Sequence, residues 1–137
     1  MDYVIDLDPT HRVLRGTVTS AFTDEGCTHL YRTVERLTSR DGPYAGILDL
    51  TQAPAFPISS NTVRVLAALE PAMPGGRPRV IVAPEAVIYG LFRMFELIRD
   101  SMGGQFQVVR SLEKAYDMVG VRPEDFTQRV FPEDLAP

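Results

Sequence analysis

The chain has 137 residues, of which 45% are hydrophobic, so it is long enough to bury a core and too apolar to be disordered. Its net charge of -4 is not that of a typical duplex-DNA-binding protein, so nucleic acid is not an expected partner. The single cysteine, Cys27, excludes an internal disulfide and a cysteine-based zinc site. No apolar run reaches the roughly 18 residues that span a bilayer, and the first residues lack a signal-peptide pattern. These features predict a cytoplasmic protein without stable membrane insertion.

The hydrophobic pattern predicts an opening hairpin followed by alternating helices and strands. Tyr3, Ile5 and Leu7 alternate with other residues as in a half-buried strand, and 8–10 has turn chemistry. Later short apolar runs are typical of strands covered on both faces, and the segments between them have apolar residues at helical spacing. In chain order the predicted elements are strands 3–7 and 13–19, a helix capped by Thr23 that ends before 40–43, a strand 45–50, a helix from Ser59 or Ser60 to Glu70 stopped by Pro71 and 74–76, a strand 79–83, a helix 86–100 closed by 103–104, a strand 106–110, and a helix capped by Ser111 that ends at Gly120.

This β-β-α-β-α-β-α-β-α order predicts an α/β fold with a mixed, mainly parallel sheet and helices packed on it. Residues 1–120 form one domain in this prediction. Residues 121–137 contain three prolines and are expected to form a C-terminal tail that is either docked on the domain or loose.

Two adjacent serines follow the predicted strand that contains Asp49. Ser59 and Ser60 stand at the expected helix start, where hydroxyls and free N–H groups suit a phosphate or another anion. Serine is also among the most favoured N-cap residues, so a purely structural role stays open. For Asp49, an acid–base role competes with the commoner role of accepting hydrogen bonds from loop N–H groups.

This segment resembles the STAS family of anti-sigma-factor antagonists, which has the SpoIIAA-like fold. Leu48-Asp49-Leu50 matches the family's Leu-(Asn/Asp)-(Leu/Met) strand, and Ser59-Ser60 matches the serines of its Asp-Ser-Ser-Gly helix start. The segment 91–94, Leu-Phe-Arg-Met, looks like the Leu-Phe-Asp-Met pattern of the family's next-to-last helix. The segment 110–115 looks like its closing strand-to-helix turn. The likeness extends over about residues 3–120.

The resemblance implies a non-enzymatic bacterial regulatory module that binds a protein partner, such as a kinase or an anti-sigma-type regulator. It puts Ser60 in the phosphoacceptor position, with Ser59 as the second candidate. Ile58 stands where the family has Asp, and Asn61 stands where it has Gly. Comparison of such divergent proteins with the SEC14-type lipid-binding class keeps a small-molecule or lipid carrier as the alternative. A carrier predicts an apolar pocket under the 53–58 loop and the helix from Ala86.

A partner surface is expected at the helix start and on the helix 86–100. Tyr89, Arg93 and Glu96 recur on the side of that helix opposite its apolar stripe, which indicates either a solvated face with an Arg93–Glu96 pair or a binding face. The expected partner-binding residues are Asp49, Ser59, Ser60, Asn61, Arg64, Tyr89 and Arg93. A homodimer is left open.

Other chemistry-bearing residues do not form a recognisable catalytic or metal motif. His11 and His29 are not spaced like metal ligands, and Cys27 falls on an apolar helix stripe as a core residue. The chain has neither a P-loop nor a Gly-x-Ser-x-Gly elbow. The sequence therefore predicts no metal, no cofactor and no catalytic residue.

Overall fold

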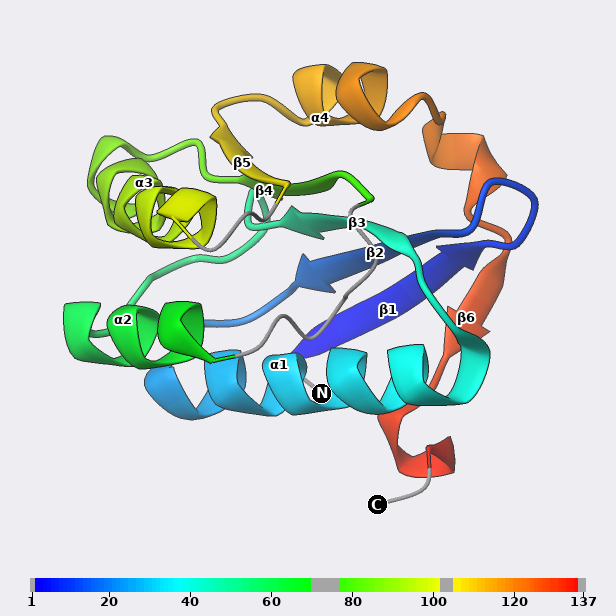
Figure 1. The fold of residues 1–137 in the computed structure, drawn as a ribbon, viewed down its shortest axis with the longest axis horizontal. Coiled ribbons are helices and arrows are strands. Elements are labelled where there is room, and N and C mark those ends of the chain that lie inside the picture. Colours follow the sequence, from blue (N-terminus) through cyan, green and yellow to red (C-terminus); the bar gives the residue numbers. More distant parts are fainter. Residues whose placement is uncertain (1, 70–76, 102–104, 136–137) are drawn as a thin grey trace.

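The computed structural model describes residues 2–69, 77–101 and 105–135. The predicted helix end at Glu70, the stop at Pro71 and 74–76, and the closure at 103–104 lie outside these residues. The elements are β1 (Tyr3–Asp8), β2 (Val13–Val18), α1 (Asp24–Asp41), β3 (Ala45–Asp49), α2 (Ser60–Ala68), β4 (Arg79–Val82), α3 (Ala86–Ser101), β5 (Phe106–Val109), α4 (Leu112–Val119) and β6 (Gln128–Val130), with short 3-10 turns at Pro123–Asp125 and Pro132–Asp134 (Figure 1).

The strands form one six-stranded sheet in the order β5-β4-β3-β2-β1-β6. The pairs β2–β3, β3–β4 and β4–β5 are parallel, whereas β1 is antiparallel to both β2 and β6. The predicted α/β fold with a mixed, mainly parallel sheet and an antiparallel hairpin is thus confirmed. None of the helices in the described part of the chain is long and apolar enough to cross a bilayer.

Helices cover the two faces of the sheet unequally. Strand side chains such as Ile5, Leu14 and Ile81 share one core with α1, α2 and α3, while Val13 and Ile47 share a second core with α4 (Figure 1). This division follows from the two-residue period of the strands, which sends alternate side chains to opposite faces. The larger core therefore lies on the three-helix face, and a short α4 covers part of the other.

The C-terminal segment adds a strand that the sequence pattern did not predict. In β6, Val130 pairs with Ile5 and Gln128 pairs with Leu7, so the segment is docked along the outer edge of β1. Val130 and Leu135 are buried in the larger core. A three-residue strand with polar Gln128 and Arg129 carries almost no periodicity, because its identity depends on pairing with a distant part of the chain.

The part of the sheet that α4 leaves uncovered is closed by a polar network centred on Asp6. Its carboxylate accepts hydrogen bonds from Arg15 Nη2 at 3.2 Å and from Arg129 Nε of β6 at 2.7 Å. Arg15 also donates to the Tyr116 hydroxyl at 2.8 Å, and its guanidinium lies 4.4 Å from the centre of the Phe126 ring. This network links β1, β2, α4 and the C-terminal segment.

The packing of α3 corrects one expectation. Glu96 pairs with Arg93 as predicted, but it does not lie on a solvated face, because it is only 5% exposed. Its Oε1 accepts a hydrogen bond from the Val108 N–H of β5 at 3.2 Å. Helical spacing alone placed Glu96 with the exposed residues, whereas β5 lies against this side of α3.

Replacing Asp6 by Asn tests the polar network. Asp6→Asn removes the charge that pairs with Arg15 and Arg129, and we expect a loss of about 2 kcal/mol in the free energy of unfolding, measured by urea titration. The matched control is Glu35→Gln, because Glu35 pairs with Arg32 on an exposed helix surface and should change stability by less than about 0.5 kcal/mol. Equal losses in the two variants would contradict a special role for Asp6.

Candidate functional site

Ser59 caps α2, and its side chain is committed to that role. Its backbone is extended, with φ -90° and ψ 151°, and its Oγ accepts a hydrogen bond from the Thr62 N–H at 3.1 Å. The first helical N–H groups lack partners within a helix, so this cap satisfies one of them. Ser59 therefore has the capping role that the sequence allowed for one of the two adjacent serines.

An acidic side chain from another helix already lies at the start of α2. Asp24, the first residue of α1, accepts a hydrogen bond at 2.7 Å from the Ser59 N–H. This hydrogen bond is the main reason that the pKa of Asp24 is below its ordinary value. A helix N-terminus favours negative charge, and α2 has no acidic residue in its own first turn. The carboxylate of Asp24 thus lies at the helix start where the sequence suggested a phosphate or another anion.

A basic side chain holds the opposite end of α2. Arg99 of α3 donates from Nη1 to the Leu69 carbonyl at 2.7 Å and from Nη2 to the Leu66 carbonyl at 3.2 Å. The last carbonyls of a helix carry partial negative charge, and α2 has no basic residue in its own last turn. Both ends of this nine-residue helix are therefore stabilised by charges from its neighbours.

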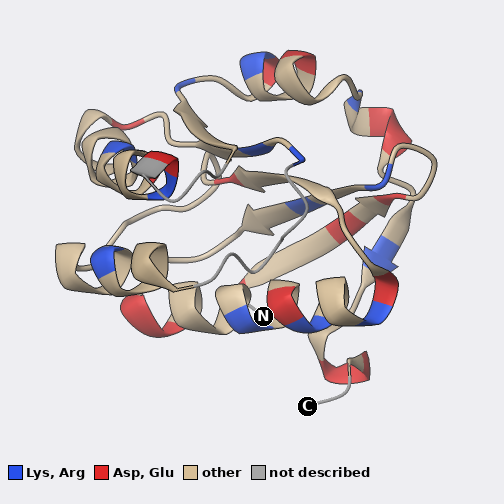
Figure 2. Ribbon diagram, viewed as in Figure 1, with Lys and Arg blue, Asp and Glu red and all other residues tan. Residues whose placement is uncertain are grey.

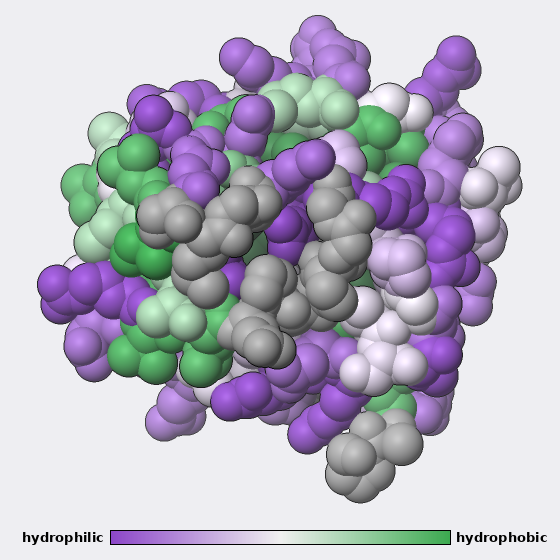
Figure 3. All heavy atoms as spheres, viewed as in Figure 1, coloured by the Kyte–Doolittle hydropathy of each residue, from purple (hydrophilic) through white to green (hydrophobic). Residues whose placement is uncertain are grey.

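The outward face of α2 combines polar and apolar side chains. Ser60, Asn61, Arg64 and Val65 are all exposed, and the Ser60 hydroxyl makes no hydrogen bond to a described residue. Few charges lie on α2, in contrast to the many on the outer side of α1 (Figure 2). Hydrophobic surface gathers over α2 and α3, where the exposed residues include Val65, Val87 and Leu97 (Figure 3).

The remaining expected partner-binding residues lie elsewhere. Asp49 is only 3% exposed, and its Oδ1 accepts hydrogen bonds from the Thr51 N–H at 2.8 Å and hydroxyl at 2.6 Å. It therefore has the loop-fixing role and cannot contact a partner in this arrangement. Tyr89 is half-buried under the Arg110 guanidinium, and Arg93 is exposed on α3 but paired with Glu96. Ser59, Ser60, Asn61 and Arg64 share the start of α2, whereas Asp49 ends β3 and Tyr89 and Arg93 belong to α3.

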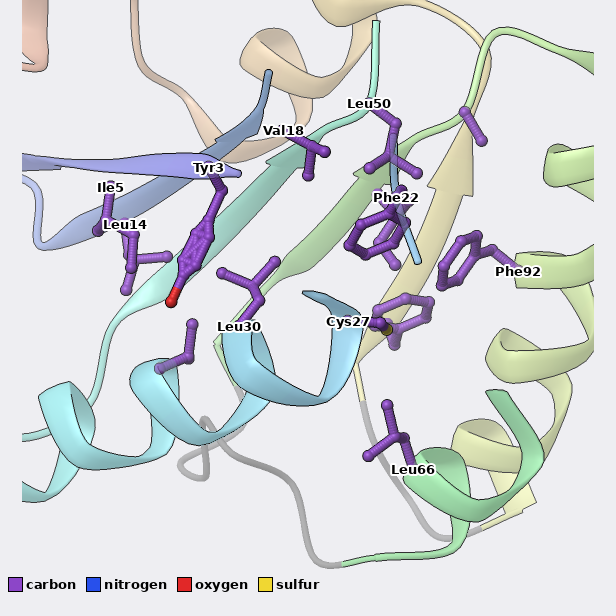
Figure 4. Packing of buried hydrophobic residues seen from close by; sticks show 14 of the residues in the cluster. Tyr3, Ile5, Leu14, Val18, Phe22, Cys27, Leu30, Leu50, Leu66 and Phe92 are labelled. Carbon is purple, nitrogen blue, oxygen red and sulfur yellow. The ribbon is translucent and has the colours of Figure 1, made fainter. Parts of the chain in front are cut away.

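Behind α2 lies an apolar cavity of about 150 Å³ between the sheet and helices α1, α2 and α3. Leu30 and Cys27 of α1, Leu66 of α2 and Phe92 of α3 point toward a common space, together with Phe22 (Figure 4). The carrier alternative predicted an apolar pocket near α3. The cavity meets that expectation for α3, but its described lining comes from α1, α2, α3 and the sheet rather than from the 53–58 loop.

Cys27 is buried in the core, and His29 forms a hydrogen bond within the fold. Burial raises the pKa of the Cys27 thiol to about 12, so the thiolate that a nucleophile requires is scarce at neutral pH. His29 accepts or donates one hydrogen bond with the Tyr3 hydroxyl at 2.8 Å.

Among the described residues, one group of possible metal ligands occurs, and it lies at the hairpin turn. Ligand atoms of Asp8, His11 and Asp125 lie within 4.8 Å of one another. However, Asp8 already accepts hydrogen bonds from the Thr10 N–H, the His11 N–H and the His11 ring. Burial opposes ionisation of Asp8, but these hydrogen bonds outweigh it and lower its pKa. The arrangement fixes the turn without requiring an ion.

The sequence pattern did not identify Asp24 and Arg99 as contributors to this site. Asp24 lies in the first turn of its own helix, where an acidic residue is favourable in any case. Arg99 lies in the last turn of α3, where a basic residue is equally ordinary. The only available signal was the absence of charged residues from the ends of α2 itself, and it does not say which helix compensates.

Alanine substitutions distinguish the two serines. Ser59→Ala removes the N-cap hydrogen bond and should lower the free energy of unfolding by about 1 kcal/mol in a urea titration. Ser60→Ala removes an exposed hydroxyl without a described partner and should change stability by less than about 0.5 kcal/mol. A larger loss for Ser60→Ala than for Ser59→Ala would show that the helix start is assigned wrongly.

The thiol of Cys27 offers a test of the buried core. Because its pKa is raised to about 12, we expect almost no reaction with a thiol reagent at pH 8 in the folded protein and rapid reaction in urea. Absorbance of the released reporter measures both rates. Comparable rates in the two states would mean that the thiol is exposed.

The comparisons with known proteins do not assign this chain to a family. No family model matches the sequence, and no curated protein matches it.

Proposed function

We propose that the protein is a regulatory interaction module of the STAS type that binds a protein partner through the start and outward face of α2. The observation that carries the proposal is the exposed Ser60 hydroxyl, which has no partner among the described residues, beside a helix start that Asp24 occupies. The surface formed by Ser60, Asn61, Arg64 and Val65 mixes a hydroxyl, an amide, a guanidinium and an apolar group. Such a mixture suits a protein surface better than a single small ion.

Phosphorylation of Ser60 would change this surface by an electrostatic mechanism. A phosphoserine carries roughly two negative charges at neutral pH, and its phosphate would stand one residue from the N–H group that Asp24 binds. Both anions favour the same helix N-terminus but repel each other. The modification is therefore expected to weaken the Asp24–Ser59 hydrogen bond and loosen the contact between α1 and α2.

A protein with phosphoserine incorporated at position 60 tests this mechanism. We expect faster hydrogen exchange at the Ser59 N–H than in the unmodified chain, and a smaller difference between modified and unmodified chains in an Asp24→Asn background. Phosphoserine at Ser39, which is exposed on α1, is the matched control and should leave that N–H unchanged. Unchanged exchange with phosphoserine at 60 would refute the mechanism.

Partner binding needs a separate experiment in cells of the source organism. A photo-crosslinking residue at Asn61 should give a discrete protein adduct that Ser60→Asp reduces, whereas the same residue at Lys114 on α4 should not. Mass spectrometry of the recovered chain maps phosphate. A chain that carries no phosphate at Ser59 or Ser60, and whose adducts are insensitive to Ser60→Asp, would overturn the proposed switch.

A further inference from the structure

We propose that the apolar cavity behind α2 is a binding site for one small, neutral, apolar molecule, such as a compound with a single aromatic ring. The site lies on the inward side of α2 and is separate from the outward surface assigned to a protein partner. Three features of the cavity support this assignment: its volume, its lining, and a glycine on the sheet side of the space.

The volume of the cavity fits one small apolar group. Protein interiors are packed nearly as densely as organic crystals, and voids larger than a water molecule are few. A volume of about 150 Å³ equals that of an engineered apolar protein cavity that stays dry and takes up benzene. The cavity therefore has room for a ring or a short aliphatic chain, but not for a whole lipid.

The lining favours a neutral ligand over a charged one. Apart from Tyr31, Arg79 and Arg99, the described residues that line the cavity are apolar. Arg99 donates from both Nη groups to the carbonyls at the end of α2, and its guanidinium lies 5.1 Å from the centre of the Phe95 ring. Tyr31 and Arg79 have interaction partners as well. A charged ligand would thus lose its hydration here without gaining a free partner in the described lining.

Four phenylalanines form a connected series of rings in the lining. Ring centroids lie 6.4 Å apart for Phe22 and Phe92, 6.3 Å for Phe92 and Phe95, and 4.5 Å for Phe95 and Phe106. Phe22 and Phe92 approach each other at the space that Leu66 also faces (Figure 4). Aromatic rings attract one another at such distances in offset and edge-to-face arrangements, so a ligand with a ring can extend the series.

A glycine in β2 contributes to the open space on the sheet side. Gly16 lies between Leu14 and Val18 on the three-helix face, where both neighbours have core side chains. Its φ is not positive, and a Cβ there would meet Leu48 and Leu30 at 3.5 and 3.7 Å, which is ordinary contact. Glycine weakens a strand interior and often marks a place where a ligand approaches closely. Because neither backbone conformation nor crowding requires Gly16, we assign it the role of leaving room for the ligand.

Titration of the isotope-labelled protein with toluene, followed by NMR, tests the site. We expect toluene to shift the methyl signals of Leu30 and Leu66 with saturation below its solubility limit. Benzoate has the same ring with a charged group and should bind at least about tenfold more weakly. Absence of saturable shifts with toluene, equal affinity for benzoate, or shifts confined to the exposed methyls of Val65, Val87 and Leu97 would overturn the proposal.

Two variants that each add one methyl group locate the ligand. Gly16→Ala places the methyl in the cavity, so it should raise the urea midpoint and weaken toluene by about tenfold. Gly90→Ala is the matched control, because Gly90 is exposed on α3 and a Cβ there would meet no described atom within 4 Å. It should also raise the midpoint, since alanine favours a helix, but leave toluene affinity unchanged. A lowered midpoint or unchanged toluene affinity in Gly16→Ala, or an equal loss of affinity in both variants, would refute the assigned site.

Discussion

The short helix α2 is held in place by charged side chains of the two neighbouring helices, α1 and α3. Asp24 from α1 accepts a hydrogen bond from the N–H of its N-cap residue Ser59, and Arg99 from α3 donates to the Leu66 and Leu69 carbonyls at its end. A helix of nine residues has little stability of its own in water, so its position depends on these contacts and on packing of Val63, Leu66 and Ala67. Because the two charges come from different helices, they also tie α1 and α3 together through α2.

This arrangement gives α2 two sides with different surroundings. The outward side of α2 carries Ser60 and Arg64, while its inward side contributes Leu66 to the cavity. A negative charge added at Ser60 would compete with Asp24 at the start of this helix. Because both sides belong to one short helix, a displacement of α2 would alter its outward surface and the cavity lining together.

The sequence predicted the elements well because they depend on local patterns. The alternation of Tyr3, Ile5 and Leu7 and the apolar spacing in α1 are visible without knowledge of any neighbour. The same holds for the caps, since Thr23, Ser59 and Ser111 all accept the hydrogen bonds typical of N-cap residues. By contrast, β6 and the burial of Glu96 depend on segments far away in the chain or on another element. The cavity and the role of Asp24 could not be predicted for the same reason, because periodicity says which side of a helix faces inward but not how completely the space there is filled.

The hydrogen bond between Glu96 and Val108 has a consequence for how the sheet ends. The carbonyl of Val109 binds the Ala83 N–H beside β4, so the neighbouring Val108 N–H points away from the sheet, toward the open side of β5. An unpaired strand edge of this kind invites pairing with a strand of another molecule, which is a common route to aggregation. Here the outward donor is already taken by a buried carboxylate from α3. A strand arriving at β5 would have to displace Glu96 first, so a single side chain gives this edge a protection that other proteins obtain from a covering loop or a bulge.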